Sequence, residues 1–386
     1  MGTSDLLHIF VTLIHITSLT LLSLLSIRVF RNLHFLRKIQ ASTIPQQQYP
    51  QVSVLVPARN EEGNIKTCLE SLGQQEYPNY EIWVLDDQST DNTLEQIQQI
   101  SVRFPEIHIL QGDSAPPPNW NGKSYACHRL SEQANGEWLL FTDADTLHTP
   151  QSIQLGIEQA LHLNVDLLSV MPQQITKSWG ERILVSFIMD FLPLLGINLQ
   201  DMWRGQTSHA IANGQYLLIR KSAYEVMGGH TAISNAMVDD FALANHFRQG
   251  DRRIAFVNGT SILACRMYQN ARDVWQGFSK NIVLSLEMTR QWSIASIILF
   301  AWGFVCLFVL PYLILMLYPY KLLAVIEILW LISFRLAVGF MMRRPPTEAL
   351  LSVFSALGVM LLGLNAISLK IRGQRILWKE RSYPTN

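Results

Sequence analysis

The segment Trp138-Leu-Leu-Phe-Thr-Asp-Ala-Asp145 decides the fold class of this chain of 386 residues. Its first four residues form a short apolar run, which predicts a buried strand. The carboxylates of Asp143 and Asp145 follow directly, and such a pair suits a hard divalent cation, Mg²⁺ or Mn²⁺, which takes oxygen ligands. Taken alone, an Asp-x-Asp pair is more often a solvated turn, so the surrounding sequence has to decide.

Three further apolar runs precede this strand: Val52–Val56, Ile82–Leu85 and Ile107–Leu110. Helical patterns separate them, and we expect Asn60 and either Thr90 or Asp91 to cap the first two helices. Alternating strands and helices predict an α/β domain with a mostly parallel sheet, whose ligands bind at the carboxyl ends of the strands. The chain has neither the GxGxxG fingerprint nor the Walker lysine loop, so any nucleotide is bound through a different motif.

Further polar motifs follow the predicted strands. Asp86 and Asp87 follow the second strand, where a carboxylate can accept a hydrogen bond from a nucleobase; the alternative is a turn that caps a helix. Lys123 follows Gly122 in a loop and can reach a diphosphate as a point charge.

The pair Asp239-Asp240 opens a predicted helix further along the chain. Burial or a like-charged neighbour can raise the pKa of one carboxyl into the range of a general base. The alternative is that both acids only complement the helix dipole.

Composition excludes several classes of protein. The chain is 49% hydrophobic and 16% charged, against about 25% charged in soluble domains. Thirty basic residues balance thirty acidic ones, which argues against a nucleic-acid-coating protein. The apolar content argues against disorder, and four scattered cysteines without CxxC argue against a disulfide framework or a structural zinc site.

The hydrophobicity is concentrated in four segments, Leu6–Ile27, Ser293–Tyr318, Leu322–Met342 and Ala349–Leu369. Basic residues after the first segment predict an outside N-terminus and a cytoplasmic middle of the chain. The basic tail also favours the cytoplasm, so we expect one of the last three segments to be interfacial or re-entrant. Three roles are open for Arg335 in the sequence: a functional charge within the membrane, an ion-pair partner for Glu327, or a side chain that snorkels to the membrane surface.

These patterns divide the chain into five parts. We expect an N-terminal transmembrane anchor (1–28), a juxtamembrane linker (29–51), a cytoplasmic catalytic domain (52–290), a C-terminal membrane region (291–370) and a basic cytoplasmic tail (371–386). The apolar segment Ile183–Leu199, interrupted by Asp190, is either a face toward the membrane or an ordinary core helix.

The order of motifs from Val52 to Asn281 resembles the family-2 glycosyltransferases, which have the A-type nucleotide-diphospho-sugar transferase fold. No single motif is specific, but six in this order and spacing are strong together. The matching segments are Val56–Glu61, Val84–Asp91, Asn121–Lys123, Asp143–Asp145, Asn213–Gln215 and Asp239-Asp240.

The resemblance implies a role for each matching position. Asp143 and Asp145 match the metal motif, with Asp145 as the direct ligand of Mg²⁺ or Mn²⁺. Asp240 matches the catalytic base, and Asp239 replaces the family's Glu. The substrate-binding positions implied are Pro57, Arg59, Glu61, Asp86, Asp87, Lys123, Asp143, Gly214 and Gln215.

Processive polysaccharide synthases have a Gln-x-x-Arg-Trp motif, whereas here Asp273 follows Gln269–Arg272. A single-transfer enzyme therefore fits better. The segments Met267–Lys280 and Trp378–Tyr383 resemble enzymes that glycosylate membrane lipids, including carotenoid and hopanoid-associated glycosyltransferases.

The resemblance implies inverting, metal-dependent, non-processive transfer of a sugar from a nucleotide sugar, foremost a UDP-sugar, to a carotenoid- or hopanoid-like hydroxyl. It also implies an integral protein of the bacterial plasma membrane that contacts the lipid bilayer and no nucleic acid. The alternatives are transfer to polyprenyl phosphate, a short polysaccharide extension, or a non-catalytic membrane protein that binds nucleotide sugar.

Overall fold

The computed structural model describes residues 3–36, 39, 49–112, 115–191, 198–288, 303, 307–317, 321–372, 376–378 and 381–383. The chain divides into two compact units. The helical unit comprises Met1–His34, Thr176–Gly196 and Tyr268–Asn386, and the sheet unit comprises Phe35–Ile175 and Ile197–Met267.

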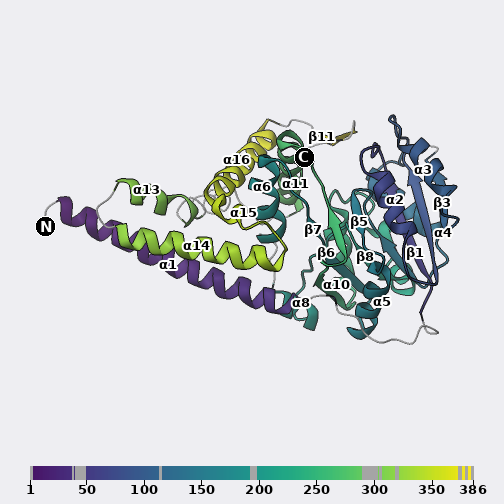
Figure 1. Cartoon of the computed structure of the whole chain (residues 1–386), viewed down its shortest axis with the longest axis horizontal. Helices are drawn as coiled ribbons and strands as arrows, with labels where there is room; N and C mark the ends of the chain where they lie inside the picture. The colour runs from purple at the N-terminus through teal and green to yellow at the C-terminus, as the bar shows by residue number, and fades with distance from the viewer. Residues whose placement is uncertain are drawn as a thin grey trace. The chain divides into compact units, whose positions relative to one another are not determined.

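A seven-stranded sheet forms the centre of the sheet unit, in the order β3-β2-β1-β4-β8-β6-β9 (Figure 1). Neighbouring strands are parallel except at β8, which runs antiparallel to both β4 and β6. The predicted α/β fold with a mostly parallel sheet is therefore confirmed. The strands are β1 (Val52–Ala58), β2 (Tyr80–Asp86), β3 (Ile107–Gln111), β4 (Trp138–Phe141), β6 (Leu167–Met171), β8 (Leu217–Arg220) and β9 (Ile254–Asn258).

Helices cover both faces of this sheet. Buried residues of α2 (Ile65–Gly73), α3 (Thr93–Ser101) and α5 (Ser152–His162) share one core cluster with alternate residues of β1. Leu55 of β1 points the opposite way because side chains alternate along a strand, and it is buried as well. On that account α4 (Gly122–Gln133), which packs against β1 and β2, covers the second face. Strands buried on both faces explain the unbroken apolar runs of the sequence.

Smaller elements complete the sheet unit. A three-stranded sheet has the order β5-β10-β7. The remaining elements are β5 (Thr146–His148), β7 (Gln173–Gln174), β10 (Leu263–Cys265), α8 (Leu199–Arg204), α9 (Lys221–Val226), the 3₁₀ turn η3 (Gly229–Ile233) and α10 (Asp239–Gln249).

Two predicted helix starts differ from the structure. The first helix, α2, begins at Ile65, and Asn60 has a positive φ of 51° in the preceding loop. The Asn60 side chain accepts a hydrogen bond from the Thr90 N–H (2.8 Å) and so joins two loops. Helix α3 begins at Thr93 with Asn92 in the N-cap position, so neither Thr90 nor Asp91 is its N-cap, although the Asp91 side chain accepts the Thr93 N–H (3.0 Å). A short polar side chain after a strand is thus as able to bond a neighbouring loop as its own helix.

Among the residues that the structure describes, three helices of the helical unit are long and apolar enough to cross a membrane: His8–Phe35, Lys321–Met341 and Ser352–Leu369. Most of the predicted segment Ser293–Tyr318 lies outside the described residues. The elements are α1 (Thr3–Phe35), α6 (Trp179–Val185), the π-helix η2 (Ser186–Phe191), α11 (Ala271–Met288), α13 (Leu310–Leu317), α14 (Lys321–Met341), α15 (Thr347–Leu350), α16 (Ser352–Ile371), β11 (Ile376–Trp378) and β12 (Arg381–Tyr383).

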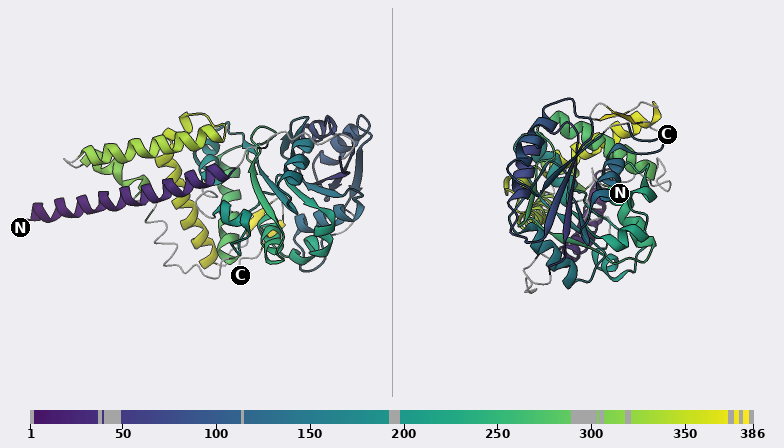
Figure 2. Two further views of the ribbon diagram at one scale, coloured as in Figure 1. Left: turned by 90° about the horizontal axis from the view of Figure 1, so that it is seen from below. Right: turned by 90° about the vertical axis from the view of Figure 1, so that its right-hand side faces the viewer.

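Helices α1 and α14 lie side by side in this unit (Figures 1 and 2). His15 Nδ1 and Glu327 Oε1 are 3.0 Å apart, and both side chains are buried. The Trp330 indole donates to Ser26 Oγ (3.1 Å). Glu327 therefore has a hydrogen-bonding partner on α1, and Arg335 of the same helix donates to Ser186 Oγ (3.3 Å).

Candidate active site

Four strands bring the predicted motifs to one edge of the sheet. The carboxyl ends of β2 and β4 flank that of β1, because Ala58 pairs with Asp86 and Leu55 pairs with Phe141. Strand β8 is antiparallel, so its first residue, Leu217, pairs with the last residue of β4. The loops after β1, β2 and β4 and the loop before β8 therefore meet at this edge.

Asp86 and Asp87 stand at the end of β2. Asp86 is only 5% exposed; its Oδ2 accepts the Ser89 N–H (3.3 Å), and its Oδ1 is buried without a hydrogen-bond partner. The Arg59 guanidinium donates to the Asp87 carbonyl oxygen (2.6 Å), which ties the loop after β1 to that after β2. A buried carboxylate oxygen with no donor is suited to accept an N–H from a ligand.

Lys123 lies in the first turn of α4, whose N-cap Asn121 accepts the Lys123 N–H (3.0 Å). Its Nζ is 2.7 Å from Asp143 Oδ1 and 3.7 Å from Asp239 Oδ2. Burial alone lowers the pKa of Lys123, but the carboxylates of Asp143 and Asp239 raise it overall well above its usual value. Lys123 is therefore a fixed positive charge between two of the predicted acidic motifs.

Asp240 is the second residue of α10, as the sequence predicts for an acid pair that opens a helix. Its two oxygens accept the backbone N–H groups of Gly214 and Phe241, both at 2.8 Å. Burial, followed by the charge of Asp239, raises the pKa of Asp240 to about 6, although Lys123 and the two N–H groups act in the opposite direction. A carboxylate with this pKa is suited to accept a proton near neutral pH.

Asp143 and Asp145 follow β4 on the loop to β5. Burial raises the pKa of Asp143 although Lys123 opposes the effect. Asp145 lies against the Cys265 thiol, whose pKa is raised well above its usual value by burial and by Asp145, so this thiol stays protonated. The two carboxylates supply hard oxygen donors of the kind that fits Mg²⁺ or Mn²⁺.

The remaining predicted residues contribute in different ways. Gly214 provides its backbone N–H to Asp240. The Gln215 side chain is buried and bonded to Gln174 and Cys265. Pro57 lies within β1, and Glu61 accepts from the Asn64 side chain (3.0 Å). Substrate contacts of these four residues stay predictions.

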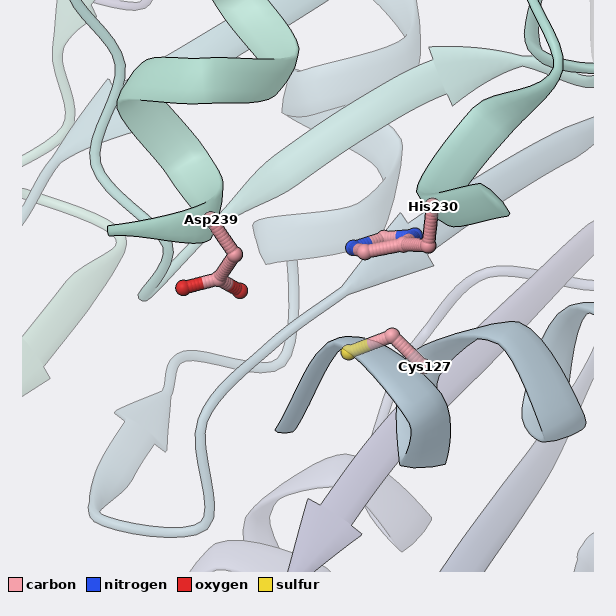
Figure 3. Close-up of side chains that lie close together, drawn as sticks. All are labelled: Cys127, His230 and Asp239. Carbon is pink, nitrogen blue, oxygen red and sulfur yellow. The ribbon is translucent and has the colours of Figure 1, made fainter. Parts of the chain in front are cut away.

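Cys127 of α4, His230 of η3 and Asp239 of α10 form a buried cluster that the sequence did not predict (Figure 3). Their potential ligand atoms lie within 4.8 Å of one another. Burial lowers the pKa of His230 to about 4 and raises that of Cys127 well above its usual value, so both are neutral. His230 Nδ1 is 2.8 Å from the Tyr224 hydroxyl.

These groups come from three separate elements and share no spacing motif, so only the fold brings them together. With Lys123 already 3.7 Å from Asp239, we interpret Cys127 and His230 as neutral packing that buries one side of the acid pair.

Comparison with known proteins relates part of this chain to glycosyltransferases. The family model described as Glycosyl transferase family 2 matches residues 53–228. The 4,4'-diaponeurosporenoate glycosyltransferases of Staphylococcus aureus strains MRSA252 and USA300 are 28% identical over 255 residues, or 65% of this chain. The match spans 66% of those relatives, slightly under two thirds of their length.

One solved structure of similar fold is a mannosyltransferase, PcManGT from Pyrobaculum calidifontis, in complex with GDP-Man and Mn²⁺. The TM-score is 0.55 at 17% identity, covering 93% of this chain and 98% of the other. At this identity the likeness concerns the fold alone. The comparisons thus relate residues 53–228, a little under half of the chain, to family-2 glycosyltransferases, and they relate the fold to that of the solved mannosyltransferase.

Proposed function

We propose that this protein transfers one sugar from a nucleotide sugar to a lipophilic acceptor in the membrane, with inversion at the anomeric carbon. The observation that carries the proposal is the position of Asp240. Its carboxylate has a pKa of about 6 and shares a site with the Lys123 ammonium group and the Asp143 carboxylate. One site thus holds a base and a cationic group suited to a diphosphate.

Asp86 and Lys123 hold the two ends of the donor in this proposal. The buried, unpartnered Oδ1 of Asp86 accepts an N–H from the nucleobase, which selects Asp86 over Asp87. Lys123 neutralises charge on the diphosphate. A UDP-sugar is the proposed donor, although the solved mannosyltransferase of similar fold holds GDP-Man.

A divalent cation belongs to the proposed site. Lys123 already occupies one oxygen of Asp143, which favours Asp145 as the direct ligand and leaves Asp143 as the second. When bound, Mg²⁺ or Mn²⁺ stabilises negative charge on the leaving diphosphate. Mn²⁺ in the solved mannosyltransferase is consistent with this choice.

Asp240 acts as the general base. It takes the proton of the acceptor hydroxyl while the hydroxyl oxygen forms a bond to the anomeric carbon. The bond from that carbon to the diphosphate breaks in the same displacement, and the nucleoside diphosphate leaves. A single displacement inverts the anomeric centre and needs no covalent sugar intermediate.

A lipophilic acceptor is supported by two independent observations. Three helices in the described part of the chain are long and apolar enough to cross a membrane, and the relatives in Staphylococcus aureus are named for a carotenoid acceptor. We accordingly propose a carotenoid- or hopanoid-like acceptor, an integral protein of the bacterial plasma membrane and a cytoplasmic catalytic domain.

The test replaces Asp240 by Asn, which keeps the shape and loses the basic oxygen. Membranes that contain the full chain are supplied with Mn²⁺ and radiolabelled UDP-glucose, UDP-N-acetylglucosamine or GDP-mannose, and label extracted into organic solvent is counted. We expect the variant to lose about 10²- to 10⁴-fold in transfer rate. The control is Asp251→Asn, because the Asp251 side chain is almost fully exposed.

Equal rates for wild type and Asp240→Asn would remove Asp240 from the role of base. Absence of any transfer by the wild-type chain with all three donors would favour the non-catalytic binding protein.

A further inference from the structure

The His230 ring lies beside the acid pair in the interior of the sheet unit. It belongs to η3 and is 1% exposed, while Asp239 is the first residue of α10. Figure 3 shows the ring nitrogen farther from the backbone, Nε2, turned toward the Asp239 carboxylate. The potential ligand atoms of the two side chains lie within 4.8 Å of each other. Whether Nε2 carries a proton therefore decides how the two groups interact.

The Tyr224 hydroxyl determines which nitrogen of the ring is protonated. It lies 2.8 Å from His230 Nδ1 and accepts the His230 backbone N–H (3.1 Å). A tyrosine hydroxyl has one proton to donate, and the other acceptor in reach, Ser131 Oγ, is more distant at 3.3 Å. The shorter contact favours donation to Nδ1, which leaves the proton of the neutral ring on Nε2.

The charge of Asp239 favours the same tautomer. An N–H dipole that points at a carboxylate is attracted to it, whereas a nitrogen lone pair in that position is repelled. Burial lowers the pKa of His230 to about 4 although Asp239 acts in the opposite direction, so the neutral ring has one proton to place. The titratable groups that act on the ring are those of Asp239, Lys123 and His128, and the Cys127 thiol lies in the same cluster.

Two glycines before His230 allow the tyrosine to reach the ring. Gly228 and Gly229 have positive φ values of 74° and 48°, which glycine adopts without the strain of a side chain. A Cβ added at Gly229 would lie 2.2 Å from Tyr224 Cζ. Tyr224 thus packs directly against the turn that presents His230.

Asp239 connects this ring to the proposed base. Its Oδ2 is 3.7 Å from Lys123 Nζ, which is longer than a hydrogen bond, so a second donor can still orient the carboxylate. The charge of Asp239 is the largest cause, after burial, of the raised pKa of Asp240. A group that holds Asp239 in place therefore also maintains the electrostatic surroundings of Asp240.

We propose that His230 is a positioning residue, which directs its Nε2–H at Asp239 and so orients that carboxylate beside Asp240. The Tyr224 hydroxyl holds the ring in the tautomer that this role requires. The inference rests on the proposed function, because it concerns the surroundings of the base in that reaction.

The tautomer is measured by NMR on the full-length protein in detergent, with ¹⁵N-labelled histidine at about pH 7. The signals of His230 are those that disappear in His230→Gln. We expect a protonated Nε2 and an unprotonated Nδ1. A proton on Nδ1 would overturn the inference, and this measurement requires no sugar transfer.

Transfer rates test whether His230 acts through Asp239. We expect His230→Leu, which removes the donor, to lower kcat/KM by about tenfold. His230→Gln should retain most of the rate, because its amide N–H replaces Nε2–H. In an Asp239→Asn background, His230→Leu should cost less than about threefold, since the charge on which the ring acts is gone. Equal costs in both backgrounds, or equal rates for Gln and Leu, would indicate packing alone and overturn the inference.

The matched control is His246→Leu. His246 is a half-buried histidine of α10 whose Nε2 lies 2.8 Å from the Met227 carbonyl oxygen. This variant should transfer sugar at the wild-type rate, and a loss as large as that of His230→Leu would count against a specific role for His230. Thermal unfolding identifies any variant that does not fold, in which case the tautomer decides. Failure of the proposed function appears separately, as wild-type transfer by Asp240→Asn.

Discussion

Asp240 occupies a position where its neighbours act on its pKa in opposite directions. Burial and the adjacent Asp239 raise the pKa to about 6, whereas Lys123 and two backbone N–H groups lower it. The carboxyl is thus protonated more readily than an exposed aspartate but is still ionised at neutral pH. Because the folded-state pKa is raised from 3.8 to about 6, the cost of Asp240 to stability develops as the pH rises between these two values and stays constant above them, so Asp240→Asn is not expected to lower thermal stability at neutral pH.

The pH dependence of transfer follows from this balance. A general base works only when deprotonated, so kcat/KM should fall as the pH drops through about 6. Asp239→Asn removes the like charge and should move this inflection to lower pH. Initial rates measured between about pH 4.5 and 8 test the prediction, with Asp251→Asn as the variant that leaves the inflection in place. An inflection unmoved by Asp239→Asn would contradict the assignment.

Gly214 lies where the site leaves little room for a side chain. A Cβ added there would lie 3.2 Å from Lys123 Nζ and 3.4 Å from Asp240 Oδ2. Gly214→Ala should displace both groups and reduce kcat/KM by about tenfold or more, because misplaced catalytic groups are costly. Gly63→Ala is the control, since nothing lies within 4 Å of its added Cβ. Similar rates for the two variants would show that Gly214 does not position the site.

At the scale of elements, α1 and α14 are joined by the buried pair of His15 and Glu327. Glu327→Ala leaves His15 without this partner and should destabilise the protein in detergent by about 1–2 kcal/mol. Glu327→Gln keeps a hydrogen-bonding group and should lose less. Leu329→Ala alters an exposed residue of the same helix and serves as control. Thermal unfolding in detergent measures the stabilities of these variants. Equal loss of stability in Glu327→Ala and Glu327→Gln would contradict the prediction.

Strand prediction succeeded for the first four strands: the expected Val52–Val56, Ile82–Leu85, Ile107–Leu110 and Trp138–Phe141 correspond to β1, β2, β3 and β4. The central strands β1 and β4 are buried almost throughout, which favours apolar residues at successive positions. The edge strand β3 is less buried and keeps the exposed His108. The direction of β8 was not predictable from its apolar run. Only its pairing with β4 and β6 gives the antiparallel direction that brings Gly214 to the edge.

At the scale of the whole molecule, the candidate active site and the apolar helices together predict what the protein makes. We expect cells that express the protein to contain a lipid carrying a single added sugar, because the chain has Asp273 where processive synthases have Trp. Lipids from cells with and without the protein are compared by mass spectrometry, with Asp240→Asn as the inactive control. A polymer would contradict single transfer, and a glycosylated polyprenyl phosphate would identify the runner-up acceptor.

The sequence alone determined the resemblance to family-2 glycosyltransferases, the mostly parallel sheet and the acidic motifs at its edge. These features depend on local apolar runs and on motif order, and both can be identified in the sequence itself. The tertiary structure alone decided which groups meet: Lys123 lies between Asp143 and Asp239, and Cys127 and His230 cluster with Asp239. Such contacts join residues that are distant along the chain, and their pKa values depend on burial and charge in three dimensions.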